Sequence, residues 1–250
     1  FFTASDPEYG SELWKVPKLC TETIMTKDIF PGQNGDTPNS SYPYDFFSWN
    51  NKVFFSATTA EEGTELWKTD GTEAGTSLVA DINPGTGSST AKPICAKLPD
   101  GPLLFSANDG TTGTELWQTD GLTVQLLKDF NQSVQGPAPH YMNHKNTFGG
   151  ENDPYAFFSA YDGSIGSELM YSDGTVTGTA LCEDLIPGSS SGLSDISSGA
   201  WIAPATFVFT ASDPAMSGGR IMLVSETLNA WNTPVVTPLP LTTNPMPVVH

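Results

Sequence analysis

The feature that most constrains this chain is a sequence repeat of about 50 residues. The clearest copy is FFSATTAEEGTELWKTDGTEAGTSLVADINPG, at residues 54–85. Other copies start near residues 1, 104, 157 and 208, and the phenylalanine that ends each opening pair, from Phe2 to Phe209, recurs after 53, 50, 53 and 51 residues. A fixed period of this length is typical of propellers and other repeat architectures. Because no break in the period divides the chain, we expect a single domain over residues 1–250.

The clearest copy predicts four short antiparallel strands, at residues 44–49, 52–57, 64–69 and 76–82. The turns between them, Asn50-Asn51 and Asp70-Gly71-Thr72, consist of residues that tolerate a positive φ or cap a turn. One such sheet cannot bury both of its faces, but several sheets arranged around an axis can. We therefore predict an all-β fold, a β-propeller of five four-stranded antiparallel blades.

The C-terminal stretch 234–250 is rich in proline, which argues against a central strand or a helix. It could be an exit linker of polyproline type. It could also close the ring, because the copy at residue 1 starts at the second strand of its blade. A piece near residues 246–250 (MPVVH) would then supply the missing first strand. We favour closure, since it removes two exposed sheet edges.

The segment ELWKTDGTEAGT, at residues 65–76, resembles the ELWxTDGTxxGT repeat of a family of secreted or surface-displayed β-propeller proteins. The likeness is very close there, good at residues 115–121 and 168–179, and faint at 220–225. This resemblance implies a propeller in a large extracellular protein with adhesive or structural duties. No catalytic residues belong to the motif, so the resemblance assigns none to this chain.

The repeated residues are predicted to build the blades. The tryptophans are expected to pack between blades, with aromatic ligand platforms as the alternative. The glutamates are expected to accept backbone hydrogen bonds, with a cation site in the channel as the alternative. The aspartates are expected to cap turns, and calcium binding stays open although no EF-hand or nonapeptide spacing is present. These repeated positions are Glu12, Trp14, Glu65, Trp67, Asp70, Glu115, Trp117, Asp120, Glu168 and Asp173.

Residues outside the repeat do not form a recognisable metal or cofactor motif. His140 and His144 stand four apart in a stretch flanked by proline and glycine, and no third ligand is evident. We expect a loop there, and we expect no cofactor.

Three cysteines, Cys20, Cys95 and Cys182, show no metal-ligand spacing, and their odd number leaves at least one without a partner in this chain. The sequons at Asn39 and Asn131 are candidates for glycosylation in a secretory pathway.

The formal net charge is −18, from 10 basic and 28 acidic residues. Such a surface repels nucleic acid and anionic lipid headgroups, so we expect neither as a partner. No apolar run of 18 residues exists, which argues against insertion into a membrane. The chain opens inside a repeat without a methionine or a signal peptide, and we expect it to be a processed piece or part of a longer protein.

These observations lead us to expect a non-enzymatic extracellular or cell-surface propeller. It would act as a structural and interaction module of a larger assembly such as a filament, matrix or adhesin. Its partners would be other protein chains, including copies of itself, with glycans as a further class. Two alternatives stay open: a glycoside hydrolase with carboxylates around the channel, or a lectin-like module that binds glycans in its loops. Glu151, Asp153 and Asp195 are non-repeated candidates for such carboxylates, and nothing in the sequence brings them together.

Overall fold

The computed structural model describes residues 1–18, 22–96, 101–130, 156–193, 200–203, 206–212, 219–228 and 234–238. Over these residues the chain forms only β-strands, turns and irregular segments, which confirms the all-β prediction. None of the described residues forms a helix that is long and apolar enough to cross a membrane.

The strands form five antiparallel sheets in chain order, each a meander in which sequence neighbours pair. The first sheet contains β1 (Phe2–Asp6), β2 (Gly10–Lys15) and β3 (Ile24–Lys27), and the second β6 (Tyr44–Trp49), β7 (Lys52–Thr59), β8 (Gly63–Thr69) and β9 (Ser77–Ala80). The third contains β10 (Lys92–Ala96), β11 (Leu103–Asn108), β12 (Thr114–Thr119) and β13 (Val124–Lys128). The fourth contains β14 (Ala156–Tyr161), β15 (Ser167–Ser172) and β16 (Thr179–Glu183), and the fifth β17 (Ala200–Ala203), β18 (Thr206–Ser212), β19 (Gly219–Leu228) and β20 (Pro234–Pro238). A small hairpin, β4 (Gln33–Asn34) with β5 (Thr37–Pro38), extends from the first connector.

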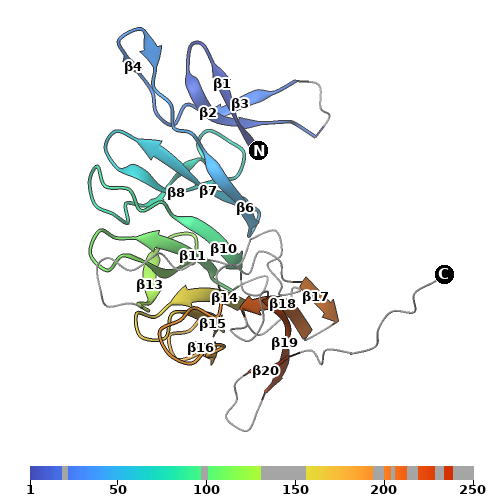
Figure 1. The fold of residues 1–250 in the computed structure, drawn as a ribbon. Helices are drawn as coiled ribbons and strands as arrows, with labels where there is room; N and C mark the ends of the chain where they lie inside the picture. Colours follow the sequence, from blue (N-terminus) through green and yellow to red (C-terminus); the bar gives the residue numbers. More distant parts are fainter. Residues whose placement is uncertain are drawn as a thin grey trace, which may run out of the picture.

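The register of the sheets follows the sequence repeat. The repeated phenylalanine of the second strand stands opposite the tryptophan or methionine of the third strand in every sheet, from Phe2 and Trp14 to Phe209 and Met222. Figure 1 shows the five sheets following one another in an arc, from the first sheet in blue to the fifth in orange and red. The sheets are therefore arranged in the manner of a propeller, and over the described residues the arc is not closed.

The hydrophobic core consists of separate clusters between neighbouring sheets. Adjacent side chains of a strand point to opposite faces of its sheet. Accordingly Trp67 packs with Leu13 and Phe55 between the first and second sheets, whereas its neighbour Leu66 packs with Phe105 between the second and third. A larger cluster joins the third, fourth and fifth sheets. This pattern explains why both aromatic and aliphatic residues recur side by side in the ELW motif.

The end of the arc at the fifth sheet exposes a position that is buried elsewhere. Ile221 in the fifth sheet is 48% exposed, whereas Leu66 at the matching position of the second sheet is fully buried. At the other end Trp14 is half-buried, but so is its counterpart Trp117 inside the arc. The free face of the fifth sheet around Ile221 is thus incompletely covered.

The proline-rich end departs in part from the linker alternative. Pro234–Pro238 forms β20, which pairs with β19 and is the last strand of the fifth sheet. Proline is tolerated in an edge strand because one row of N–H groups there needs no partner. Residues 246–250, in which we expected a closing strand, lie outside the described residues.

Candidate functional site

The repeated glutamates are buried and accept hydrogen bonds from the backbone. The carboxylate of Glu65 accepts the N–H of Ile82 at 3.1 Å and that of Ser89 at 2.9 Å, which ties the end of β9 to the connector that leads to the next sheet. We call this arrangement the glutamate clasp. Its counterparts are Glu12 with Ile29 and Ser41, Glu115 with Phe130, and Glu168 with Leu185 and Gly192. The four side chains are at most 2% exposed, so a substrate in solution cannot reach them.

Burial shifts the pKa of three of these carboxyls. It raises the pKa of Glu12, Glu65 and Glu168 above the ordinary value, while the hydrogen bonds from the backbone act in the opposite direction. A carboxyl with a raised pKa and no access to solvent suits a structural role better than that of a general acid, which must contact its substrate.

A serine next to three of the four clasps was missed by the sequence reasoning. The Oγ of Ser88 accepts the N–H of Thr64 at 3.0 Å, and the connectors after the first and fourth sheets repeat the contact through Ser40 and Ser191. The signal was present in the sequence, since the clasp donors Ser89 and Gly192 both follow their glutamate by 24 residues. We had interpreted one of these serine pairs as part of a sequon.

That sequon, Asn39-Ser40-Ser41, is built into the first clasp. The Oγ of Ser41 donates to the Glu12 carboxylate at 2.5 Å, and the Ser41 side chain is fully buried. The side-chain amide of Asn39 donates to the carbonyl of Pro31 at 3.0 Å. A glycan on Asn39 would have to replace that hydrogen bond. Asn131, the other glycosylation candidate, lies outside the described residues.

The repeated aspartates occupy turns at the opposite end of the third strand. Asp70 Oδ1 accepts the N–H of Thr72 at 2.9 Å and its hydroxyl at 2.7 Å, and Asp173 does the same with Thr175. Hydrogen bonds of this kind lower the pKa of Asp70 and Asp120, so both carboxylates stay ionised near neutral pH. Among the described residues no three His, Cys, Asp or Glu side chains lie together to hold a metal ion.

A lysine ladder joins neighbouring sheets at these turns. Lys15 of the first sheet donates to the carbonyl of Gly71 in the second, and Lys68 of the second donates to that of Gly121 in the third, both at 2.5 Å. The third sheet has Gln118 at this position, and its buried Oε1 has no hydrogen-bond partner among the residues that the structure describes. The ladder therefore ends after two steps.

The ladder borders a hollow between the second and third sheets, which we call the 2–3 hollow. Its volume is about 240 Å³. Trp49 and Phe54 lie beneath it, with ring centroids 5.3 Å apart, and both are buried, at 8% and 0% exposed. The polar groups around it are Asn50, Lys52, Lys68 and Asp120, and the exposed side chain of Leu122 stands beside them.

A second hollow lies on the other side of the Asn50-Asn51 turn, between the first and second sheets, and we call it the 1–2 hollow. Its volume is about 330 Å³, and its lining includes Phe1, Trp49, Asn51 and Asp70. Both turn asparagines have a positive φ, of 48° and 56°. The predicted hairpin turn thus forms, and it lies between the two hollows.

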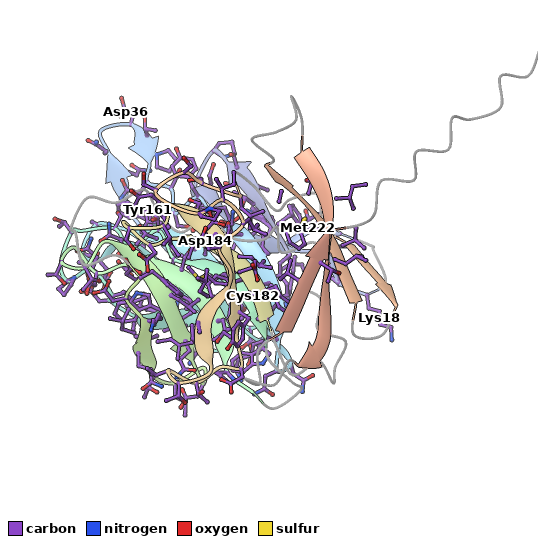
Figure 2. All side chains as sticks on the ribbon, turned by 60° about the horizontal axis from the view of Figure 1, so that its bottom comes forward. Lys18, Asp36, Tyr161, Cys182, Asp184 and Met222 are labelled. Carbon is purple, nitrogen blue, oxygen red and sulfur yellow. The ribbon has the colours of Figure 1, made fainter. Side chains whose placement is uncertain are left out.

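The other sequence candidates are not brought together. His140, His144, Glu151, Asp153, Asp195 and Cys20 lie outside the described residues, and so does the side chain of Cys95. Cys182 of β16 and Met222 of β19, labelled in Figure 2, pack against the same core between the fourth and fifth sheets. Burial raises the pKa of the Cys182 thiol to about 12, which disfavours the reactive thiolate.

Comparison with known proteins yields little sequence likeness. No family model and no curated protein matches the chain. Among the solved structures that are similar is that of a novel alpha-L-arabinofuranosidase (CtGH43) from Clostridium thermocellum. It is 13% identical, with a TM-score of 0.32, and the match covers 80% of this chain and 74% of that chain.

This comparison contradicts two of our expectations. We predicted a non-enzymatic structural and interaction module, whereas the solved structure found is that of a glycoside-cleaving enzyme. The prediction rested on the low charge density, the sequons, the odd number of cysteines and the start inside a repeat, and none of these features bears on catalysis. Function depends on sites that a fold carries rather than on the fold itself, so residues outside the repeated motif also have to be considered.

Proposed function

We propose that this protein is a carbohydrate-active propeller that binds a glycan in the 2–3 hollow. The observation that supports the proposal is the combination of amide, ammonium and carboxylate groups around one small opening, at whose floor Trp49 keeps 8% of its surface exposed and Leu122 keeps 77%. Sugar rings present apolar C–H faces and many hydroxyl groups, so they need both kinds of surface. Most small-molecule pockets exceed about 300 Å³, and a hollow of about 240 Å³ suits a single sugar unit of a longer chain.

Each polar group has a chemical task in this proposal. Asp120 Oδ1 already accepts two backbone N–H groups, of Leu122 at 2.8 Å and of Thr123 at 2.7 Å, so the second carboxylate oxygen is the one to accept sugar hydroxyls. Asn50 can both donate and accept, and the ammonium group of Lys52 can donate. The backbone bonds at Asp120 fix the carboxylate in place before a ligand arrives, which lowers the entropic cost of binding.

The proposal includes the finer fold. We infer five blades in a closed ring, in which the free face of the fifth sheet around Ile221 meets the free face of the first sheet around Trp14. The exposure of Ile221, compared with the buried Leu66 at the matching position of the second sheet, supports the inference. Membership of the ELWxTDGTxxGT family, an extracellular location and glycans as partners belong to the same proposal.

The decisive experiment compares two neighbouring asparagines. Affinity electrophoresis through gels that contain arabinan, xylan, mannan or laminarin identifies a retained polysaccharide, and calorimetry with its trisaccharide gives the affinity. Asn50→Gly removes the amide but keeps the positive φ, which glycine adopts without strain. We expect it to weaken binding about 2- to 10-fold, the value of one or two hydrogen bonds.

Asn51→Gly is the matched control, because Asn51 has the same conformation but does not line the 2–3 hollow. It should bind as the unchanged protein does. Equal losses in both variants would point to the turn rather than the hollow, and no retention by any polysaccharide would refute the proposal.

The same mixtures test glycoside hydrolysis as the alternative to binding without turnover. Hydrolysis requires two carboxyls about 5–10 Å apart, one of them a proton donor. The 2–3 hollow supplies Asp120, whose lowered pKa suits a base or nucleophile. Release of reducing sugar that depends on Asp120 would therefore require a second carboxyl from outside the described residues, where Glu151, Asp153 and Asp195 are candidates.

A further inference from the structure

We propose that the 1–2 hollow is a second sugar-binding subsite, in which a unit of the same glycan chain stacks on the ring of Phe1 and donates a hydrogen bond to Asp70. The glycan crosses the Asn50-Asn51 turn between the two hollows, and it is an uncharged polysaccharide rather than an acidic one. This inference rests on the glycan binding proposed for the 2–3 hollow. It adds a second subsite, the residues that form it and the class of glycan.

The two hollows adjoin each other. Trp49, Asn50 and Lys52 line both of them, so only the turn that follows Trp49 separates one hollow from the other. Asn50 and Lys52 are exposed at the surface. A sugar chain that occupies one hollow is therefore positioned to extend across the turn into the other.

The repeat gives both hollows the same parts. The ring of Phe1 lies beside Gly71 of the second sheet, just as the ring of Phe54 lies beside Gly121 of the third. The aspartates that precede these two glycines line the two hollows, one in each. Two equivalent sites in neighbouring positions suit a ligand that is itself built of repeated units, and a polysaccharide is such a ligand.

The two hollows differ in the apolar surface that a sugar can reach. In the 2–3 hollow Trp49 and Phe54 are buried, and the exposed apolar side chain is that of Leu122. In the 1–2 hollow Phe1 is 43% exposed, and the volume is about 330 Å³. An exposed phenylalanine ring presents a flat apolar face, which the C–H face of a sugar ring can cover. The 1–2 hollow thus supplies the stacking surface that the 2–3 hollow lacks.

Asp70 gives the second subsite the polar group that Asp120 gives the first. Its Oδ1 accepts the N–H of Thr72 at 2.9 Å and the hydroxyl of Thr72 at 2.7 Å. These hydrogen bonds hold the carboxylate in place and leave Oδ2 to accept a sugar hydroxyl. Lys52 lines both hollows, so its ammonium group can donate to a hydroxyl in either subsite.

The charges around the hollows select the class of polysaccharide. Asp70 and Asp120 place one carboxylate in each subsite, and both stay ionised near neutral pH. The ammonium group of Lys68 already donates to the carbonyl of Gly121. The chain as a whole has a net charge of −18. An acidic polysaccharide would be repelled by the two carboxylates and by this net charge, whereas an uncharged one would not.

The stacking contact is tested with the full chain and a hexasaccharide of whichever of arabinan, xylan, mannan or laminarin the gels retain. Calorimetry on the unchanged protein should give one hexasaccharide per chain. Phe1→Ala should weaken this binding about 3- to 10-fold, the value of covering the exposed part of one phenylalanine ring. Phe1→Tyr keeps the ring and should recover most of the loss. Tyr9→Ala is the matched control, because Tyr9 is also an exposed aromatic residue of the first sheet and lines neither hollow.

The polar contact is tested in the same titration. Asp70→Asn keeps an oxygen that can accept the Thr72 hydrogen bonds, and it replaces the second acceptor with an NH₂ group. We expect it to weaken hexasaccharide binding about 2- to 10-fold. Neither contact of the second subsite is made by Asn51, so Asn51→Gly keeps its role as the control for the turn.

The outcomes separate this inference from the proposed function. If Asn50→Gly weakens binding while Phe1→Ala and Asp70→Asn do not, the glycan occupies the 2–3 hollow alone, and the second subsite is overturned while the proposed function stands. Two hexasaccharides per chain would overturn the single glycan that spans both hollows. Retention in gels that contain alginate or polygalacturonate would overturn the preference for an uncharged chain. Failure of every polysaccharide to retain the protein would overturn both proposals.

Discussion

The first and second sheets share the same motif, and they differ at their inner edge. Both have the glutamate clasp, through Glu12 and Glu65, and both extend a lysine to the next sheet. The second sheet has a further strand, β6, that covers its aromatic residues, while β1 is an edge among the described residues. The motif thus determines how a sheet folds and how it joins the next sheet. Whether the aromatic residues of the sheet are buried depends on a further strand that lies outside the motif.

The largest expected effect comes from truncating the covered aromatic residue. Phe54→Ala should lower the free energy of unfolding by about 3–5 kcal/mol, the usual cost of emptying a buried phenylalanine site. Phe1→Ala should cost less than half as much, because that ring is 43% exposed and has the 1–2 hollow beside it. Urea unfolding followed by tryptophan fluorescence measures both. Equal losses would contradict the difference between the two sheets.

A smaller effect is expected at the clasp, where the two sheets should behave alike. Glu65→Gln replaces one acceptor oxygen with an NH₂ group that faces a backbone N–H. One buried donor is then unsatisfied, at a cost of about 1–3 kcal/mol. Glu12→Gln should cost a similar amount, since it also accepts two backbone N–H groups. A clasp that matters in only one of the two sheets would show that the motif is not the shared element proposed here.

The clasps also predict a pH dependence. Because burial raises the folded-state pKa of Glu12, Glu65 and Glu168, the folded protein binds protons more tightly there than the unfolded chain does. The stability that these three carboxyls contribute is fully present below the ordinary carboxyl pKa, and it is lost as the pH rises through their raised folded-state pKa values. The melting temperature should therefore be higher near pH 5 than near pH 7.5. A melting temperature that rises over this interval would contradict the sign.

Relief of charge repulsion at lower pH acts in the same direction in a chain of net charge −18. The Glu65→Gln variant separates the two causes. Its melting temperature should vary less with pH than that of the unchanged protein, because one of the three titrating carboxyls has been removed. At still lower pH, Asp70, Asp109 and Asp120 act in the opposite direction, since their lowered pKa values give stability that is lost on protonation.

The smallest expected effect extends the lysine ladder to a sheet that lacks it. Gln118→Lys should place an ammonium group near the carbonyl of Gly174, which occupies the turn position of Gly71 and Gly121 and has the same positive φ. One charge-assisted hydrogen bond replaces an unsatisfied amide oxygen, and we expect a gain of about 0.5–1.5 kcal/mol. Gln118→Met is the control, since it removes the unpaired oxygen without adding a donor. If both variants gain equally, the ladder contributes nothing.

Much of the fold could be predicted because each copy of the repeat contains the strand and turn residues that determine its local structure. The Asn50-Asn51 and Asp70-Gly71 turns, the alternation of Leu66 and Trp67, and the buried Glu65 all depend on residues close in sequence. The candidate site could not be predicted in the same way. Trp49 and Lys68 of the second sheet and Asp120 of the third are separated by up to 71 residues, and only the packing of one sheet on the next places them around a common hollow.

The sequence by itself determined the period and the meander of each sheet, because strand pairing and turn conformation are local properties that each copy of the repeat encodes. Only the tertiary structure decided which copies are complete and where a ligand could fit. Ile221 and Leu66 are equivalent in sequence, and one is exposed while the other is buried. The physical reason is that the burial of a side chain depends on whether a neighbouring sheet packs against it. The sequence of one copy does not show whether such a neighbour is present.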